Sequence, residues 1–160
     1  MAVRLGILSD THVGGECLGI PLWVSEAFAG VDMIIHAGDL EDADILAELT
    51  AIAPCYAVRG NMDSSVTNLP LFRTLEVEGR LVLVAHRYEE AVRHMNAEVL
   101  LLVHGHTHIP EFRDEGAVFV LNPGSPTRPR GGNRRSVALV EISGNSVKAT
   151  FKYQPEHADT

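Results

Sequence analysis

Seven residues with metal-binding side chains each follow an apolar stretch of this chain. Their donor atoms are carboxylate oxygens, one amide oxygen and imidazole nitrogens, a mixture that suits first-row cations such as Mn, Fe, Zn or Ni. No thiolate occurs in these motifs. The sequence therefore predicts a centre for divalent cations, built from Asp10, His12, Asp39, Asn61, His86, His106 and His108.

Two of the motifs have the spacing of a chelating pair. Asp10 and His12 are separated by one residue, as are His106 and His108. Side chains two positions apart lie on the same side of an extended segment, so we expect each pair to hold one cation. Asp39 follows a glycine, which allows close approach of the backbone, and its two oxygens can bridge two cations about 3.5–4 Å apart.

The strands that precede these motifs predict how the motifs meet. Apolar, β-rich runs end directly before each of them. These runs are Val3–Ser9, Met33–Ala37, Tyr56–Val58, Leu81–Ala85 and Val99–Val103. Ligands of open α/β sheets bind at the carboxyl ends of strands, so we expect five segments distant in sequence to converge on one spot.

The order of elements predicts one domain of the α/β or α+β class over residues 1–160. Helical patterns cover residues 22–29, 41–52 and 89–96. Because the first two alternate with the early strands, those strands are expected to be parallel.

The second half of the chain has a different pattern. Arg73–Val77 and Leu81–Ala85 flank Glu78-Gly79, which predicts a hairpin. Val99–Val103 lacks alternation and is expected to be buried on both faces. Further strands are expected around Gly116 and Gly144, on either side of a loop at 122–133, and the polar tail 154–160 is expected to fray.

Composition indicates a globular protein of a reducing compartment. The chain is 46% hydrophobic and 21% charged, and 160 residues suffice to bury a core without disulfides. Neither a signal peptide nor an apolar run of about 18 residues is present, so we expect no membrane association. Cys17 and Cys55 have no metal-ligand or CxxC spacing, which favours a cytoplasmic location.

The charge balance argues against one class of partner. The formal net charge is −8, and binding to bulk nucleic acid requires a basic surface. One local exception is a group of arginines in and after the 122–133 loop, which either binds a small phosphorylated ligand or is simply solvated. These residues are Arg128, Arg130, Arg134 and Arg135.

The motifs resemble those of the calcineurin-like metallophosphoesterases in order and approximate spacing. They are Asp10-x-His12, Gly38-Asp39, Gly60-Asn61-x-Asp63, His86 and Gly105-His106-Thr107-His108, within residues 1–125. The chain is most similar to the small single-domain bacterial and archaeal phosphodiesterases, whose Asn-Pro-Gly-Ser segment reappears at 122–125. The resemblance implies a β-sandwich of two mixed sheets flanked by helices, in four αββα layers.

The resemblance also implies a dinuclear centre, with Mn²⁺ expected and Fe, Zn or Ni as alternatives. Asp10, His12, Asp39 and His108 would hold one cation, and Asp39, Asn61, His86 and His106 the other. A hydroxide between the cations would hydrolyse a small phosphate ester. The residues expected to be catalytic are Asp10, Asp39, Asn61, His86 and Asp63. Asp63 either supports the ligands or closes a local turn.

Two positions depart from the family pattern. Many related phosphomonoesterases have a histidine after the motif asparagine, where this chain has Met62, which cannot transfer a proton. This predicts phosphodiesterase rather than monoesterase activity. Where relatives read His-Gly-His, this chain reads His86-Arg87-Tyr88, so residue 87 either reshapes the pocket rim or contacts phosphate.

Two other functions stay open beside hydrolysis of a small ester. A scaffold for protein–protein interaction, like the retromer subunit of similar fold, would be expected to have eroded ligands. A metal-dependent nuclease agrees with the site but not with the net charge. The natural substrate is not determined by these motifs, and a homo-oligomer such as a dimer is expected only by resemblance. His36 and His104 are interpreted as core or supporting residues rather than ligands.

Overall fold

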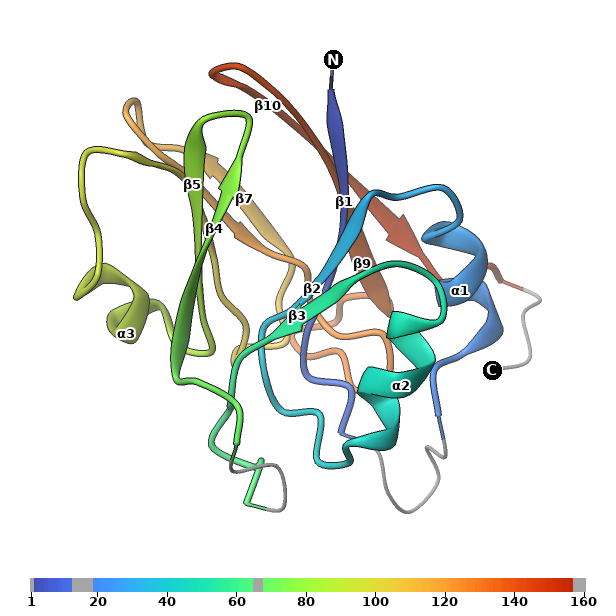
Figure 1. Cartoon of the computed structure of the whole chain (residues 1–160). Coiled ribbons are helices and arrows are strands. Elements are labelled where there is room, and N and C mark those ends of the chain that lie inside the picture. Colours follow the sequence, from blue (N-terminus) through green and yellow to red (C-terminus); the bar gives the residue numbers. More distant parts are fainter. Residues whose placement is uncertain (1, 13–18, 65–67, 157–160) are drawn as a thin grey trace.

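The structure is a computed structural model that describes residues 2–12, 19–64 and 68–156. Within these ranges there are ten strands and three helices (Figure 1). The strands are β1 (Val3–Leu8), β2 (Met33–His36), β3 (Cys55–Ala57), β4 (Phe72–Val77), β5 (Arg80–Ala85), β6 (Val99–Val103), β7 (Glu111–Asp114), β8 (Phe119–Asn122), β9 (Ser136–Ser143) and β10 (Ser146–Tyr153). The helices are α1 (Leu22–Ala27), α2 (Asp44–Thr50) and α3 (Tyr88–Val92).

The strands form two five-stranded sheets. The first has the order β10-β9-β1-β2-β3 and the second β4-β5-β6-β8-β7. In the first, β1, β2 and β3 are parallel, as expected, and β9 and β10 are antiparallel additions. In the second, β5, β6 and β8 are parallel and β4 and β7 are antiparallel edges. Both sheets are therefore mixed, as expected.

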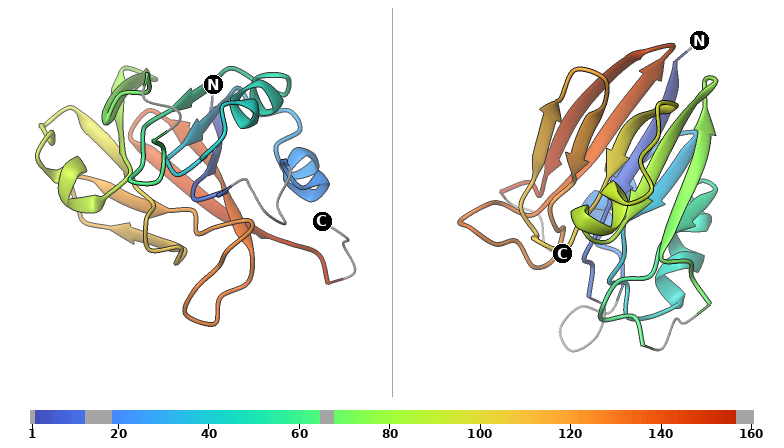
Figure 2. Two further views of the ribbon diagram at one scale, coloured as in Figure 1. Left: turned by 90° about the horizontal axis from the view of Figure 1, so that it is seen from below. Right: turned by 90° about the vertical axis from the view of Figure 1, so that its left-hand side faces the viewer.

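Three apolar clusters hold four layers together. The cluster between the sheets contains Leu5 of the first and Leu101 of the second. On the outer face of the first sheet, α1 and α2 contribute residues such as Val24 and Leu49, and Ala91 of α3 covers the second sheet. Figures 1 and 2 show α3 on the opposite side of the molecule from α1 and α2. The αββα sandwich is confirmed.

Strand β6 is buried along its whole length, which explains its unbroken apolar sequence. Leu101 and Val103 face the other sheet, whereas Val99 and Leu102 pack in the cluster with α3. The pairing of β6 with β5 shifts after Val99, so Leu100 is an extra residue that also joins the inner cluster. A bulge of this kind accommodates one residue without reversing the burial of the rest of the strand.

The hairpin at Glu78-Gly79 is confirmed. Val77 pairs with Arg80, and the two intervening residues have φ values of 53° and 76°. A two-residue turn with positive φ at both positions matches the twist of the strands that it joins.

The helices are shorter than the sequence patterns suggested. Helix α2 begins at Asp44 rather than at residue 41, because Glu41 has a φ of 68°, outside the right-handed helical region. The Asp42 side chain then accepts the Asp44 N–H at 2.9 Å. Helix α3 ends at Val92 rather than at residue 96, and the His94 N–H bonds the carbonyl group three residues back, as in a tightened last turn. None of the described helices is both long and apolar enough to cross a membrane.

The packing between the sheets generates the first prediction. Leu101 is fully buried, so Leu101→Ala should lower the free energy of unfolding by about 2–5 kcal/mol through lost transfer energy and cavity formation. The matched control is Leu22→Ala, whose side chain is 65% exposed and which should change it by less than about 0.5 kcal/mol. Chemical denaturation measures both, and equal losses in the two variants would contradict this account of the core.

Candidate metal centre

The carboxyl ends of five strands meet at one end of the sandwich. Strands β1, β2 and β3 come from the first sheet, and β5 and β6 from the second. Each is followed directly by one of the polar motifs. The site is therefore built across both sheets, and it depends on how they pack.

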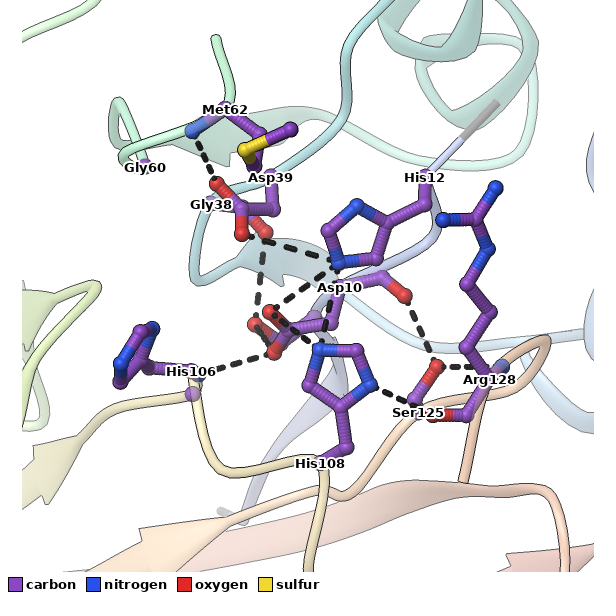
Figure 3. A network of polar contacts seen from close by, with 12 residues as sticks. Asp10, His12, Gly38, Asp39, Gly60, Met62, His106, His108, Ser125 and Arg128 are labelled. Carbon is purple, nitrogen blue, oxygen red and sulfur yellow. Dashed lines mark hydrogen bonds and ion pairs between the residues drawn. The ribbon is translucent and has the colours of Figure 1, made fainter. Parts of the chain in front are cut away.

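Five of the seven metal-binding candidates, namely Asp10, His12, Asp39, His86 and His108, form a compact cluster. Figure 3 shows Asp10, His12, Asp39 and His108. Asp10 Oδ1 lies 3.3 Å from His108 Nε2 and 3.7 Å from the Nε2 atoms of His12 and His86. Asp39 Oδ2 lies 3.2 Å from His86 Nε2 and 3.6 Å from His12 Nε2. The donors thus fall into two groups that share Asp10, one with His12 and His108 and the other with Asp39 and His86.

The two paired motifs are not extended, so the expected reason for each pair to hold one cation was wrong. The φ angle is 56° at Asp10, 43° at His12, 73° at His106 and 61° at both Asp39 and His108. Such left-handed backbone costs about 1–3 kcal/mol at each non-glycine residue and needs support from its surroundings. Part of that support comes from the first two motifs themselves, whose backbones form two hydrogen bonds with each other.

Glycines allow the motifs to approach one another. A Cβ atom at Gly60 would overlap the Asp39 carboxylate and lie 2.5 Å from the Asp39 nitrogen. A Cβ atom at Gly105 would overlap the Ser9 hydroxyl and lie 2.6 Å from Asp10 Oδ2. Both positions therefore require glycine because of contacts between loops that are distant in sequence.

The three imidazoles of the cluster are oriented through their Nδ1 atoms. His86 Nδ1–H donates to the Ala37 carbonyl at 2.8 Å, and His12 Nδ1–H donates to Glu41 Oε2 at 2.6 Å. His108 Nδ1–H donates to the carbonyl of Arg128. Each Nε2 is left facing the cluster, which is the arrangement by which supporting residues orient metal-binding histidines.

The cluster fits a pair of cations. In the described part of the chain, buried Asp10 Oδ1 and His86 Nε2 lack a hydrogen-bond partner. The Nε2 atoms of His12 and His108 face each other at 3.2 Å, and with both Nδ1–H groups in use, their lone pairs need a proton or cation between them. Two carboxylates and three imidazoles are a donor set for first-row divalent cations.

The electrostatics favour positive charge at the same place. Burial raises the pKa of Asp10, but contacts with His108 and His12 outweigh it and hold this pKa far below its usual value. Burial also raises the pKa of Asp39, but His86 lowers it overall. For His12 and His86, burial lowers the pKa, yet the carboxylates raise it overall. The carboxylates therefore stay ionised and attract either protons or cations.

Asn61 and His106 lie at the wall of a pocket over the cluster. The pocket has a volume of about 330 Å³, Asn61 is exposed and His106 is half-buried. The His106 ring is 5.2 Å from that of His86, and the main-chain N–H of His106 donates to Asp10 Oδ2 at 2.9 Å. Burial and the charge of Arg87 lower the pKa of His106, so residue 87 acts on this wall electrostatically.

Asp63 supports the loops and also closes a turn, so both earlier interpretations hold. Its Oδ2 accepts the N–H groups of Asp39 and Gly60, each at 2.8 Å. Its Oδ1 accepts the N–H of Glu41 at 2.7 Å. One buried carboxylate thus ties the second motif to the third.

Several supporting residues were not identified from the sequence. The Glu41 carboxylate orients the His12 ring. The position of Glu41, two residues after Asp39, was the sequence feature that could have identified it. The Ser125 hydroxyl donates to the Asp10 carbonyl at 2.8 Å, and Asn122 Nδ2 donates to the Gly105 carbonyl at 3.2 Å. The Asn-Pro-Gly-Ser segment therefore fastens the loops that carry Asp10 and His106, a role that resemblance alone did not supply.

The remaining candidates separate into different places. His36 is buried, its Nδ1 accepts the Gly38 N–H, and burial lowers its pKa to about 3, as suits a core histidine. His104 is buried outside the two groups.

Arg128 and Arg130 line the pocket, whereas Arg134 stacks on Tyr153 at 4.8 Å. The arginine cluster is thus divided. Cys17 and the end of the tail, 157–160, lie outside the described residues.

Comparisons place these features in a family. A family model for the calcineurin-like phosphoesterase superfamily domain matches residues 3–145. A probable metallophosphoesterase of Methanothermobacter thermautotrophicus is 38% identical over 154 residues, which cover 91% of this chain and 89% of that protein. Phosphodiesterase YfcE of Escherichia coli is 32% identical over 102 residues, 58% of this chain and 55% of YfcE. Vacuolar protein sorting 29 of Cryptosporidium parvum superposes with a TM-score of 0.76 at 14% identity, covering 97% of this chain and 99% of that one, which shows likeness of fold alone.

The Asp63 contacts generate a prediction about the support of the site. An amide oxygen cannot replace both carboxylate oxygens, so Asp63→Asn should lose at least one buried acceptor and destabilise the protein by about 1–3 kcal/mol. It should also bind Mn²⁺ about 10–100-fold more weakly. Thermal unfolding and metal titration measure these effects.

The matched control for this substitution is Asp114→Asn. Asp114 is exposed and accepts a single N–H, from Gly116 at 2.9 Å, which an amide oxygen can still accept. It should leave stability and Mn²⁺ affinity almost unchanged. Equal Mn²⁺ affinity of the Asp63 variant and the wild type would show that Asp63 does not support the centre.

Proposed function

Because the chain belongs to the calcineurin-like phosphoesterase superfamily, we propose that it is a phosphodiesterase that works with two divalent cations. The observation that carries this proposal is the pair of donor groups that meet at Asp10. Two buried atoms of those groups, Asp10 Oδ1 and His86 Nε2, have no hydrogen-bond partner among the described residues. Cations at these positions would satisfy both atoms.

The proposed ligand sets overlap at Asp39 rather than at Asp10, which the two compact donor groups share, because Asp39 Oδ2 lies near both His12 and His86. Asp10, His12, Asp39 and His108 would hold one cation, and Asp39, Asn61, His86 and His106 the other. Asp39 Oδ1 accepts the Met62 N–H at 2.8 Å, whereas Oδ2 faces both His12 and His86, so Asp39 would contribute to both sets. The second position is the more open one, because Asn61 is exposed and His106 is half-buried, whereas Asp10, His12 and His108 are buried. Mn²⁺ is the cation that we expect, with Fe, Zn or Ni as alternatives.

Different residues of the chain would have different roles in the reaction. When bound, the cations would lower the pKa of a water molecule and neutralise charge on the phosphate oxygens. Glu41 and the carbonyl groups of Ala37 and Arg128 hold the imidazoles in the orientation that this requires. Asp63 keeps the two loops that carry Asp39 and Asn61 together.

Met62 supports a diester as the substrate. Its side chain is 49% exposed and lines the pocket, at the position where many relatives have a histidine. A thioether cannot protonate a departing alkoxide, so the leaving group must depart without that help. Diesters with good leaving groups, such as aryl esters, suit this wall better than alkyl monoesters. The pocket volume of about 330 Å³ suits a small substrate.

The rival functions fit the site less well. A scaffold would make no catalytic use of the convergent donors found here. Because vacuolar protein sorting 29 of Entamoeba histolytica has been solved in complex with Zn²⁺, turnover rather than metal binding distinguishes the two functions. A nuclease would need a basic groove on a chain of net charge −8. Cytoplasmic location and assembly into dimers stay predictions from the sequence.

Hydrolysis of bis(p-nitrophenyl) phosphate tests the proposal. Chelated protein should be inactive and should recover activity with Mn²⁺. Asp39→Asn and His86→Ala should each lower kcat/KM at least about 100-fold, beyond the effect of residues that only support ligands. The control is His94→Ala, because His94 stacks on Phe72 at 3.5 Å and lies outside both donor groups. Absence of turnover, even with cations bound, would favour the scaffold.

The role of Met62 makes a separate prediction. Met62→His should raise kcat/KM for an alkyl phosphomonoester at least about tenfold, because the imidazole can protonate the leaving alkoxide. Met62→Leu, which cannot transfer a proton, should not. A wild-type enzyme that already prefers the alkyl monoester to bis(p-nitrophenyl) phosphate would contradict this interpretation.

A further inference from the structure

Two arginines form one wall of the pocket over the metal centre. Arg128 and Arg130 line it together with His12 and His108, which belong to the donor cluster, and Met62 lines it as well. Figure 3 shows Arg128 extending from the loop that connects β8 and β9. The pocket therefore has a cationic wall and an apolar residue over one set of donors.

The loop that carries these arginines is fastened to the centre itself. The Arg128 N–H donates to the Ser125 hydroxyl at 2.9 Å, and that hydroxyl donates to the Asp10 carbonyl. The Arg128 carbonyl accepts the Nδ1–H of His108, and the Arg130 N–H donates to the His108 carbonyl at 3.4 Å. The backbone from which both guanidinium groups extend is thus held at a defined place relative to His108.

Neither guanidinium group forms an ion pair with a carboxylate of the described residues. Other arginines do so, since Arg113 lies 2.6 Å from Glu115 and Arg93 lies 3.2 Å from Glu90. In a chain with eight excess acidic charges, two arginines without acidic partners beside a pocket are placed to meet an anion from outside.

The negative charge of a phosphodiester alone does not explain why the pocket wall has two arginines. A phosphodiester carries one negative charge, which the proposed cations would already neutralise. Guanidinium groups match the geometry of phosphate oxygens through paired hydrogen bonds. We propose that Arg128 and Arg130 bind a second phosphate group, so that the substrate is a small phosphodiester that carries a further phosphate. This inference rests on the proposed phosphodiesterase function.

Two aryl esters that differ by one phosphate test the inference. They are thymidine 5′-(p-nitrophenyl phosphate) and the same ester with a 3′-phosphate, and both release p-nitrophenol. With Mn²⁺-loaded protein, the 3′-phosphorylated ester should have a kcat/KM at least about tenfold higher, the size of one net charge-assisted hydrogen bond. Arg128→Ala with Arg130→Ala should abolish this preference through KM.

Controls separate a subsite from a general effect. Arg134→Ala should keep the preference, because Arg134 stacks on Tyr153 and donates to the Gln154 carbonyl. The readout is the ratio of the two kcat/KM values, which should fall from at least about tenfold in the wild type to about one in the double variant, whatever the change on the ester without the 3′-phosphate. Equal kcat/KM of the wild type for both esters would overturn the inference. Equal losses on both esters in the double variant would also overturn it.

Binding distinguishes failure of the subsite from failure of the proposed function. Calorimetry compares thymidine 3′,5′-bisphosphate with thymidine 5′-monophosphate on the wild type and the double variant. If neither ester is hydrolysed but the bisphosphate binds at least about tenfold tighter in an arginine-dependent manner, the subsite stands and the phosphodiesterase does not. If the two nucleotides bind equally, the subsite fails whatever the activity.

Discussion

The buried carboxylate of Asp10 is the constraint on which the other loops depend. An ionised carboxylate out of water is costly unless hydrogen bonds and opposite charge compensate it. Its Oδ2 accepts bonds from the Ser9 hydroxyl and the His106 N–H, and its main-chain carbonyl accepts one from Ser125. Its Oδ1 faces three imidazoles. Three segments that are distant in the chain thus converge on Asp10, because its buried carboxylate needs hydrogen bonds and opposite charge.

Contacts with neighbouring segments also support the strained backbone of the loops that carry the donors. Each loop leaves a strand that is anchored in the apolar clusters, and each is tied to a neighbouring loop by hydrogen bonds such as those of Asp63. The loops at Gly60 and Gly105 come so close to their neighbours that a methyl group would displace a carboxylate. Assembly of the site therefore depends on the packing of the two sheets, and no single motif could hold this geometry alone.

The other residues that line the pocket differ more from the family pattern than the metal-binding candidates do. The candidates are the donors expected of the superfamily, whereas Met62 replaces a proton donor and two arginines stand beside it. A metal centre is common to many phosphate esters, so selectivity has to come from groups that contact the rest of the substrate. The net negative charge of the chain repels anions in general, whereas Arg128 and Arg130 attract them at this opening.

The sequence by itself determined most of the strands and the positions of the donors along the chain, because apolar periodicity and strand ends are local properties. The layers were expected only from the family resemblance. Only the tertiary structure decided how the donors converge. The chelating pairs were expected to be extended, but they have left-handed backbone at Asp10 and His108, because contacts between the loops support that conformation. Glu41 was assigned to a helix and instead orients His12. Such roles depend on partners far away in the chain, which no local pattern encodes.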